Sequence, residues 1–182
     1  MLENRPSDEP LTVPRAFEPL RPFQHREYRN ALGRFATGVN IITTRHDAHV
    51  HGMTANAFTS VSLDPPLVLL SLDNRSRMHQ ILPATLLFGV SVLAEDQEEL
   101  SNHFAGRVVN DLGVNFIDRL DVPLIEGAIA HFVVEVVNTH AAGDHTLYIG
   151  KVEYFETFDR RPLLFYAGRY EQLHNRSSAE KP

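Results

Sequence analysis

The hydrophobic residues near the start of the chain follow the period of a helix. Tyr28, Leu32 and Phe35 stand four and then three positions apart, so they share one face of a helix, and the pattern predicts a helix over residues 24–37. Gly38 follows where this helix should end, because glycine readily adopts the positive φ that is common at helix C-termini. One helix therefore precedes the first strand.

From residue 39 onward the pattern changes to that of β-strands. Runs rich in apolar and β-branched residues predict strands over 39–44, 52–58, 67–72, 86–93 and 163–166, and a hairpin of 127–138 and 145–155 with its turn at 140–144. The strand at 67–72 is apolar on both faces, as a central strand is. Six or seven strands with few helices predict a mainly β fold, an antiparallel barrel rather than a doubly wound sheet.

Two insertions between strands predict short helices. Asp96 and Glu99 are spaced as in a capping box, and Leu100 and Phe104 share one face of the helix that would follow. Residues 73–79 also open a helix, where two arginines, a hydroxyl and free helical N–H groups suit an anion. A capped turn in solvent explains the same residues equally well.

Length and composition suit one domain with short extensions. The chain has 182 residues and a mass of 20.6 kDa. Prolines and acidic residues alternate in residues 1–22, which predicts an extended N-terminal arm, and residues 174–182 form a polar tail, so that the domain is 23–173. The N-terminus lacks a signal peptide's apolar stretch, and no apolar run approaches the ~18 residues of a membrane span, so we expect a cytoplasmic protein with no membrane partner.

Charge and cysteine content exclude several classes of function. A net charge of −6 argues against a nucleic-acid partner, because phosphates require a basic face. The absence of cysteine excludes disulfides, thiolate zinc sites and cysteine nucleophiles. The glycines form neither a G-x-G-x-x-G motif nor a P-loop, so a nucleotide would need another arrangement to hold its phosphates.

Histidines stand out at two predicted turns. His46, His49 and His51 suggest a metal site, since His49 and His51 could point the same way on a strand. No carboxylate pattern accompanies them, so we interpret the segment as a hairpin tip and expect no metal. His145 lies in a Gly-Asp-His sequence at the second turn, where a histidine is more often structural or solvated than functional.

Small polar residues are dense in residues 52–66, GMTANAFTSVSLDPP. Thr54, Asn56, Ser60 and Ser62 offer hydrogen-bond donors and acceptors, and the small side chains let a flat ring approach the backbone. A polar edge strand that ends in a Pro-Pro turn is an equally good explanation.

Four segments carry a resemblance to a known family. They are TGVNIITT (37–44), GMTANAFTSVSLDPPLVLLSLD (52–73), SVLAEDQEELSNHFA (91–105) and GDHTLYIGKV (143–152). In order and spacing, over residues 25–172, the chain resembles the short-chain flavin reductases of two-component monooxygenases, of the 4-hydroxyphenylacetate hydroxylase reductase type. The resemblance implies a split β-barrel with short peripheral helices, a homodimer, and FAD or FMN bound in a groove near the dimer interface.

The resemblance also implies which residues form the site. The flavin-binding positions, from the ring and ribityl chain to the ring edge and then the phosphate, are Thr54, Ala55, Asn56, Ser60, Val61, Ser62, Ser76, Arg77 and His79, with Thr37 as a weaker candidate. His145 would face the nicotinamide as the catalytic position, and Tyr170 would help to close that side.

The implied activity is hydride transfer from NADH or NADPH to the flavin, which is then supplied to a flavin-dependent monooxygenase. This chemistry needs no protein acid, base or nucleophile, so the missing cysteine is no obstacle. The protein must hold the nicotinamide C4 about 3 to 3.5 Å from the flavin N5. A flavin carrier without turnover is the alternative, and a pyridoxamine-phosphate-oxidase-like enzyme is a third.

Overall fold

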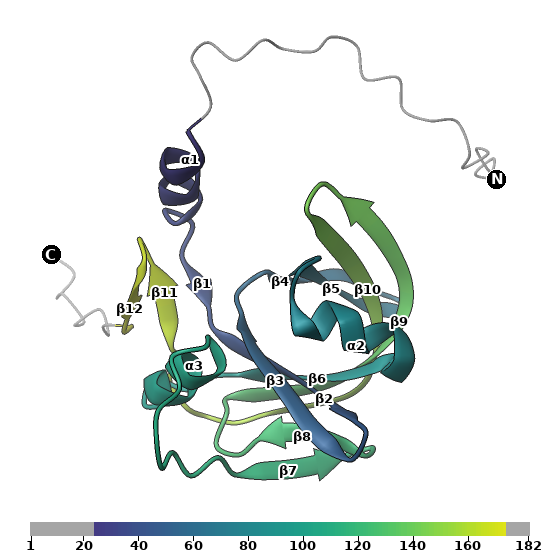
Figure 1. Cartoon of the computed structure of the whole chain (residues 1–182). Helices are drawn as coiled ribbons and strands as arrows, with labels where there is room; N and C mark the ends of the chain where they lie inside the picture. Colours follow the sequence, from purple (N-terminus) through teal and green to yellow (C-terminus); the bar gives the residue numbers. More distant parts are fainter. Residues whose placement is uncertain (1–23, 174–182) are drawn as a thin grey trace, which may run out of the picture.

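The computed structural model describes residues 24–173, which form three helices and twelve strands (Figure 1). The helices are α1 His25–Leu32, α2 Arg77–Thr85 and α3 Glu98–Phe104. The strands are β1 Thr37–Gly38, β2 Asn40–His46, β3 His49–Ala55, β4 Phe58–Leu63, β5 Pro66–Asp73, β6 Leu87–Val92, β7 Phe116–Arg119, β8 Val122–Ile125, β9 Ala130–Ala142, β10 His145–Thr157, β11 Leu164–Tyr166 and β12 Arg169–Glu171. The predicted arm and tail lie outside the described residues.

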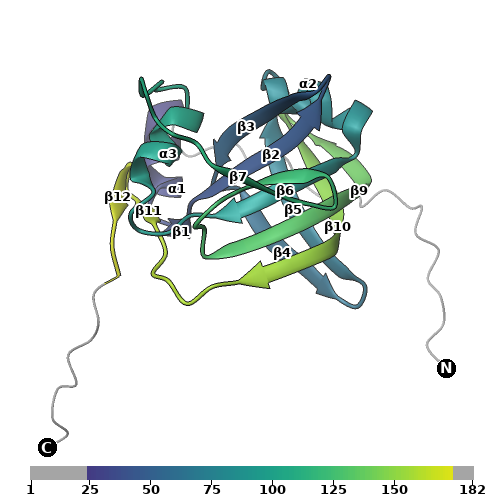
Figure 2. The same cartoon turned by 90° about the horizontal axis from the view of Figure 1, so that it is seen from below.

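One antiparallel sheet of seven strands dominates the fold, in the order β3-β2-β6-β9-β10-β5-β4. In a flat sheet β3 and β5 would be five strand spacings apart, roughly 24 Å. Helix α2 nevertheless contacts both β3 and β5, as well as β2 and β6, so the sheet curves around this helix (Figures 1 and 2). Small sheets of β1-β11-β12 and of β7-β8 flank it.

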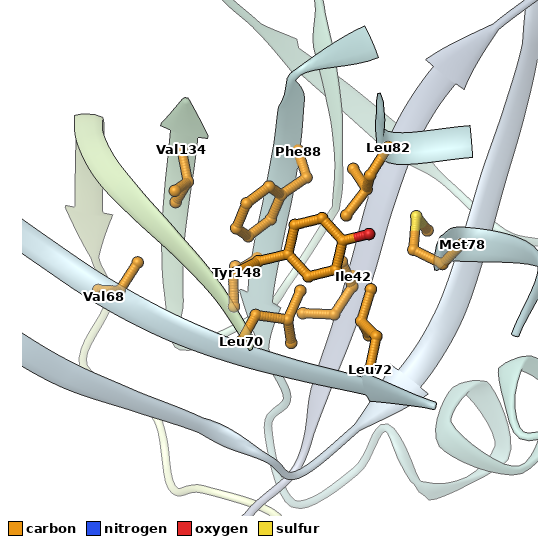
Figure 3. Packing of buried hydrophobic residues seen from close by; sticks show 10 residues of the cluster. Ile42, Val68, Leu70, Leu72, Met78, Leu82, Phe88, Val134 and Tyr148 are labelled. Atoms are coloured by element: carbon orange, nitrogen blue, oxygen red, sulfur yellow. The ribbon is translucent and has the colours of Figure 1, made fainter. Parts of the chain in front are cut away.

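The main core fills the inside of this curve (Figure 3). Its buried members come from β2, β5, β6, β9, β10 and α2, and they are Ile42, Val68, Leu70, Leu72, Met78, Leu82, Phe88, Val90, Val134 and Tyr148. Tyr148 lies at the centre, and its hydroxyl is 2.7 Å from Nδ1 of His79 on α2. Burial raises the pKa of this hydroxyl.

A second core lies under α3 and positions β3. Leu100 and Phe104 of α3 both pack against its buried residues, as their predicted shared face requires. The Phe104 ring also lies against Gly52 of β3, where an added Cβ would come within 2.5 Å of the ring. Glycine at this position therefore lets α3 and β3 approach closely.

The first predicted helix is confirmed in kind but is shorter than expected. It ends at Leu32, and Gly33 closes it with φ −63°. Thr37 and Gly38 pair with Phe165 and Leu164 instead, so the prediction of Gly38 as the end of the helix is wrong. Pairing with a distant strand outweighs the local helical spacing here, since most helical stability comes from packing.

The long hairpin is confirmed as β9 and β10, but β9 continues to Ala142, so the turn consists of Gly143 and Asp144 and is shorter than the predicted 140–144. Three other features of the strands also differ from prediction. The predicted strand 52–58 is split between β3 and β4, and the β7–β8 hairpin was not predicted. Strand β5 was predicted to be apolar on both faces, as a central strand is, but only one of its faces is buried. Its side chains alternate between buried and half-buried. The number of strands consequently exceeds the six or seven predicted.

The capping box at Asp96 is wrong in detail. Helix α3 begins at Glu98 after Gln97, and no side chain caps it. The Asp96 carboxylate instead forms an ion pair with Arg160 at 2.6 Å. A contact with a distant residue therefore replaces the helix cap that the local pattern predicted. No helix within residues 24–173 is long and apolar enough to cross a membrane.

Candidate functional site

The outer face of β5 and β10 forms the floor of the candidate site. Val68, Leu70 and Leu72 alternate toward the core, so Leu69 and Ser71 face the other way. Cross-strand partners point to the same face, and His145 of β10 is paired with Asp73, which follows Ser71 by two positions. His145 therefore shares the outer face with Leu69 and Ser71.

A cavity of about 900 Å³ opens over this face. Its lining comes from α1, the segment that leads into β1, β1 itself, the β3–β4 connection, the start of β4, β5, β11 and the β11–β12 turn. The lining residues are Arg29, Asn30, Leu32, Gly33, Arg34, Phe35, Thr37, Asn56, Ala57, Phe58, Thr59, Leu69, Ser71, Phe165, Ala167 and Gly168. Two predicted residues, Thr37 and Asn56, are among them. The Thr37 hydroxyl oxygen is buried and has no hydrogen-bond partner. Such a group in a cavity wall marks a position where a ligand could hydrogen-bond.

The predicted phosphate segment is arranged as a helix start beside a second cavity. Ser76 precedes α2, and its hydroxyl accepts a hydrogen bond from the His79 N–H at 3.2 Å, which confirms the predicted helix. Ser76 and Arg77 line a cavity of about 410 Å³, together with residues 50–53 of β3 and with His103, Phe104 and Gly106. Arg75 points elsewhere, because its guanidinium pairs with Asp73 at 2.6 Å and lowers the pKa of that carboxyl.

Arg77 also reaches a third cavity, of about 640 Å³. Its other lining residues come from the β2–β3 hairpin and α2, and they are His46, Asp47, His49, Val50, His51, Gln80 and Ile81. The hairpin tip is confirmed, because Asp47 and Ala48 form a tight turn with φ of 50° and 62°. Within residues 24–173 no group of three or more histidine and carboxylate side chains is placed to hold a metal ion.

His145 lies at the tight turn that joins β9 to β10. Its Nδ1 is 2.7 Å from the Asp144 carboxylate, and the pKa of Asp144 is lowered by this hydrogen bond. Ser71 is two residues away along the paired strand, roughly 7 Å. The half-buried imidazole is therefore near the large cavity but outside its lining.

Two predicted side chains are already engaged by the protein. The Thr54 hydroxyl donates to the Ser101 carbonyl at 2.7 Å, which ties β3 to α3. The His79 ring is hydrogen-bonded to the buried Tyr148 hydroxyl. The predicted contacts of Thr54 and His79 with the flavin stay predictions, and each side chain also makes a hydrogen bond within the protein.

Four further predicted residues lie at two places, the end of β3 and the edge strand β4. Ala55 ends β3 next to Asn56 of the large cavity. Ser60, Val61 and Ser62 lie on the edge strand β4, where a bulge between Ser60 and Ser62 leaves Val61 half exposed. Their side chains are outside the lining of the large cavity.

Tyr170 stands apart from the other candidates. Its hydroxyl is 2.8 Å from Ser101 Oγ on α3, and it borders a small cleft with Glu95 and Glu98. Strand β12 and the β9–β10 turn lie on opposite sides of the molecule in both overall views (Figures 1 and 2). One chain therefore does not bring Tyr170 and His145 together.

Sequence analysis missed several residues of these cavities. Leu69 and Ser71 were hidden in a run interpreted as buried on both faces, although the single serine at 71 hinted at an outer face. Phe165 and Gly168 come from the C-terminal β11–β12 hairpin, which no local pattern connects to β5. The contact appears only when the chain has folded.

The fold and the site define a class of protein, and comparison with solved structures confirms it. The structure of the flavin reductase PheA2 aligns with a TM-score of 0.82 at 44% identity, over 84% of this chain and 100% of that one. The mainly β architecture is thus that of solved flavin reductases, in agreement with the predicted split-barrel class.

Sequence comparison identifies the family. Residues 32–174 match the family described as flavin reductase like domain, and the chain belongs to this family. An NADH-dependent flavin reductase from a Rhodococcus species is 52% identical over 148 residues, 80% of this chain and 84% of the relative. The reductase component of 4-hydroxyphenylacetate 3-monooxygenase from Thermus thermophilus is 37% identical over 147 residues, 80% of this chain and 95% of the relative. Other relatives are named as NADH-dependent reductases of FMN or of FAD.

The residues of the large cavity fit a flavin. Phe35, Phe58 and Phe165 supply apolar walls for a flat ring, and Asn56 supplies amide donors and acceptors. The unpartnered Thr37 hydroxyl lies in the same wall. Arg77 and Ser76 follow β5 at a separate cavity, where a phosphate would find a cation and a hydroxyl.

Proposed function

We propose that this protein is an NADH-dependent flavin reductase that supplies reduced flavin to a separate flavin-dependent monooxygenase. The observation that carries the proposal is the cavity of about 900 Å³ on the outer face of β5, with the unpartnered Thr37 hydroxyl in its wall. Membership of the flavin reductase family supports it, as do the names of the relatives.

The flavin supplies the redox chemistry when it is bound, because it accepts a hydride, two electrons and one proton, from the nicotinamide C4. The chain's own residues orient the two rings. Thr54, Ala55 and Asn56 would lie along the ring system and the ribityl chain, with Thr37 as a weaker candidate beside them. Ser60, Val61 and Ser62 would hold the ring edge and the ribityl hydroxyls, and Ser76, Arg77 and His79 would take the phosphate. Of these residues, Thr37 and Asn56 line the large cavity, and Ser76 and Arg77 line the cavity of about 410 Å³.

His145 is assigned to the nicotinamide side. It lies on the outer face of β10, roughly 7 Å along the strand from the row that contains Ser71. Its Nδ1 is held by Asp144, which fixes the orientation of the ring. No proton transfer to His145 is required by a hydride transfer, so its role is positioning.

The proposal includes a homodimer in the cytoplasm. Leu32 and Phe35 border the cavity, yet they are 56% and 78% exposed, and Leu63 on the edge strand β4 is 93% exposed. Apolar groups of this kind beside an open site favour a second copy as the cover. A second copy would also bring another Tyr170 to the assembly, so that the nicotinamide side could be closed between subunits.

Anaerobic mixing with NADH and flavin tests the function. We expect the absorbance of the oxidised flavin to disappear with turnover, and we expect His145→Ala to lower that rate while flavin affinity changes less than about twofold. Thr139→Ala is the control and should leave the rate unchanged, because Thr139 is exposed on the same hairpin but pairs with Tyr148 and so lies on its other face. Flavin binding without any loss of absorbance would show a carrier, and the reductase proposal would be wrong.

Light scattering tests the assembly separately. The expected mass is twice 20.6 kDa. A monodisperse monomer with full activity would show that one chain closes the groove, and the homodimer would be dropped while the reductase function remained.

A further inference from the structure

The turn that carries His145 is held from one side by the connection between β5 and α2. The Asn74 N–H donates a hydrogen bond to the Asp144 carbonyl at 3.0 Å. The Thr146 hydroxyl donates to Oδ1 of the same asparagine at 2.8 Å. One residue of the connection therefore makes a hydrogen bond to each neighbour of His145 in the sequence.

The connection is itself fixed by hydrogen bonds to Asp73. The Ser76 N–H donates to the Asp73 carbonyl at 2.9 Å, and the Arg75 N–H donates to the Asp73 carboxylate at 2.8 Å. The Arg75 guanidinium donates to both oxygens of that carboxylate, at 3.0 and 2.6 Å. Asp73 is paired in register with His145. Since Arg75 engages the Asp73 carboxylate, Asp144 is the carboxylate that accepts from the imidazole, at 2.7 Å.

The end of the β9–β10 hairpin has few other supports. Within residues 24–173, β9 pairs with β6 as far as Glu135 and beyond that residue only with β10. On its other side β10 pairs with β5, and the last of these pairs is His145 with Asp73. The hydrogen bonds of Asn74 lie directly past this last pair, so they fix the turn relative to β5.

The side chain of Thr146 acts from the face opposite to the imidazole. Thr146 is paired with Leu72 of the main core, so it lies on the inner face of the sheet, whereas His145 lies on the outer face. Thr146 is half-buried and Asn74 is exposed, and neither belongs to the lining of the large cavity. Substitution of either residue should therefore leave the walls of that cavity in place.

We propose that Asn74 is a positioning residue for hydride transfer, which through Thr146 and the Asp144 carbonyl holds the His145 ring beside the nicotinamide. This inference rests on the proposed function and on its assignment of His145. The nicotinamide C4 must lie about 3 to 3.5 Å from the flavin N5, and a displacement of about 1 Å can slow a reaction about 10²-fold. A small movement of the turn is therefore enough to lower the rate while the flavin stays bound.

Two variants remove the side-chain hydrogen bond from its opposite ends. Asn74→Ala removes the acceptor, and Thr146→Val removes the donor with little change in shape. In anaerobic stopped-flow mixing with saturating NADH and FMN, we expect each variant to lower the rate of flavin reduction at least about fivefold. The dissociation constant for FMN, measured by flavin fluorescence without NADH, should change less than about twofold.

Conservative and matched variants separate this role from a loss of folding. Thr146→Ser keeps the hydroxyl and should keep the wild-type rate, and Thr139→Val makes the same change at an exposed threonine of β9 and should also leave the rate unchanged. The urea midpoint of Asn74→Ala should equal that of the wild type, because the Asn74 side chain is exposed. If Asn74→Ala nevertheless folds poorly, Thr146→Val still tests the same hydrogen bond. A Thr146→Ser variant as slow as Thr146→Val would show that the hydrogen bond is not the cause and would overturn the inference.

A double variant tests whether Asn74 acts through His145. In a His145→Ala background, the addition of Asn74→Ala should change the rate less than about 1.5-fold, because the effects of two residues that act as one unit do not add. A further loss of about fivefold in that background, an unchanged rate in His145→Ala, or wild-type rates in both Asn74→Ala and Thr146→Val would overturn this inference and leave the reductase function intact. A wild-type chain that reduces no flavin would overturn the proposed function and this inference with it.

Discussion

The two faces of the β5–β10 pair differ in what their side chains contact. On the inner face, Leu70 is paired with Tyr148, and both are buried in the main core. The adjacent pair, Ser71 and Leu147, lies on the outer face, and Ser71 lines the large cavity. The same two strands therefore build the core with one set of residues and the site with the other.

This division shows why the site can be open without weakening the fold. A strand alternates its side chains, so residues that differ by one position can be changed for separate purposes. Substitutions on the inner face should lower stability, and those on the outer face or at the rim should alter ligand binding. The predictions below test this division.

The largest effect is expected for neighbouring leucines of β5. Leu70→Ala removes a fully buried side chain and should reduce the free energy of unfolding by about 2 to 5 kcal/mol, whereas Leu69→Ala should cost less than about 1.5 kcal/mol, because Leu69 is half-buried in the cavity floor. Urea denaturation of the two variants measures both values. Equal losses would show that the outer face also belongs to the core.

Arg77, at the start of α2, should affect ligand binding and leave the free energy of unfolding unchanged. Arg77→Ala should weaken FMN and FAD binding more than tenfold, about 1.5 to 3 kcal/mol, since a charge-assisted contact to phosphate is lost. Riboflavin, which has no phosphate, is the control ligand and should bind as before. Equal damage to riboflavin and FMN would mean that Arg77 is not at the phosphate.

A polar group inside the core should have a smaller effect on stability. Tyr148→Phe removes the 2.7 Å hydrogen bond to His79 without leaving a large cavity, and we expect a loss of about 0.5 to 1.5 kcal/mol in unfolding free energy. Riboflavin affinity should stay the same, because the hydroxyl faces α2 in the core (Figure 3). A changed riboflavin affinity would show that the inner face communicates with the site.

The smallest effect concerns pH and the buried His131 of β9. Its Nε2 is 2.8 Å from the Ile125 carbonyl and so donates to it, its Nδ1 has no partner, and burial lowers its pKa below the ordinary 6.5. The unfolded chain thus binds the proton more readily, and stability is lost as the pH falls below about 6.5. His131→Gln should flatten this dependence between pH 7 and pH 5 by at most about 1.4 kcal/mol per pH unit. The matched change His140→Gln should leave the slope as it is.

Much of the framework could be predicted because it rests on local patterns. The helix after Ser76 follows from its capping hydroxyl, and the β9–β10 hairpin follows from its two apolar runs and Gly143, whose φ is 66°. Residue types alone pointed to Thr54, Asn56, Ser60 and Ser62 and to an anion site in residues 73–79, each with an equally good structural explanation, and the resemblance to the family gave these residues their roles in a flavin site.

The rest depended on contacts between distant segments. Thr37 and Gly38 leave the helical pattern because they pair with Phe165 and Leu164. Strands β7 and β8 are short, and they lie beside β6 through Ser91, whose hydroxyl accepts from the Ile125 N–H at 2.9 Å. Neither contact can be derived from periodicity, because each joins residues more than thirty positions apart.

The small helix α1 has a consequence for local exchange and folding order. It has eight residues, and none of them is buried within the part of the chain that the structure describes. Isolated helices shorter than about 12 residues are marginal in water, so α1 should form late and open often. The Gly33 carbonyl accepts from the Ala167 N–H at 2.8 Å, which ties the end of this helix to the β11–β12 turn across the cavity. Amide hydrogen exchange in α1 should therefore slow when the cavity is covered, although α1 lies outside the core.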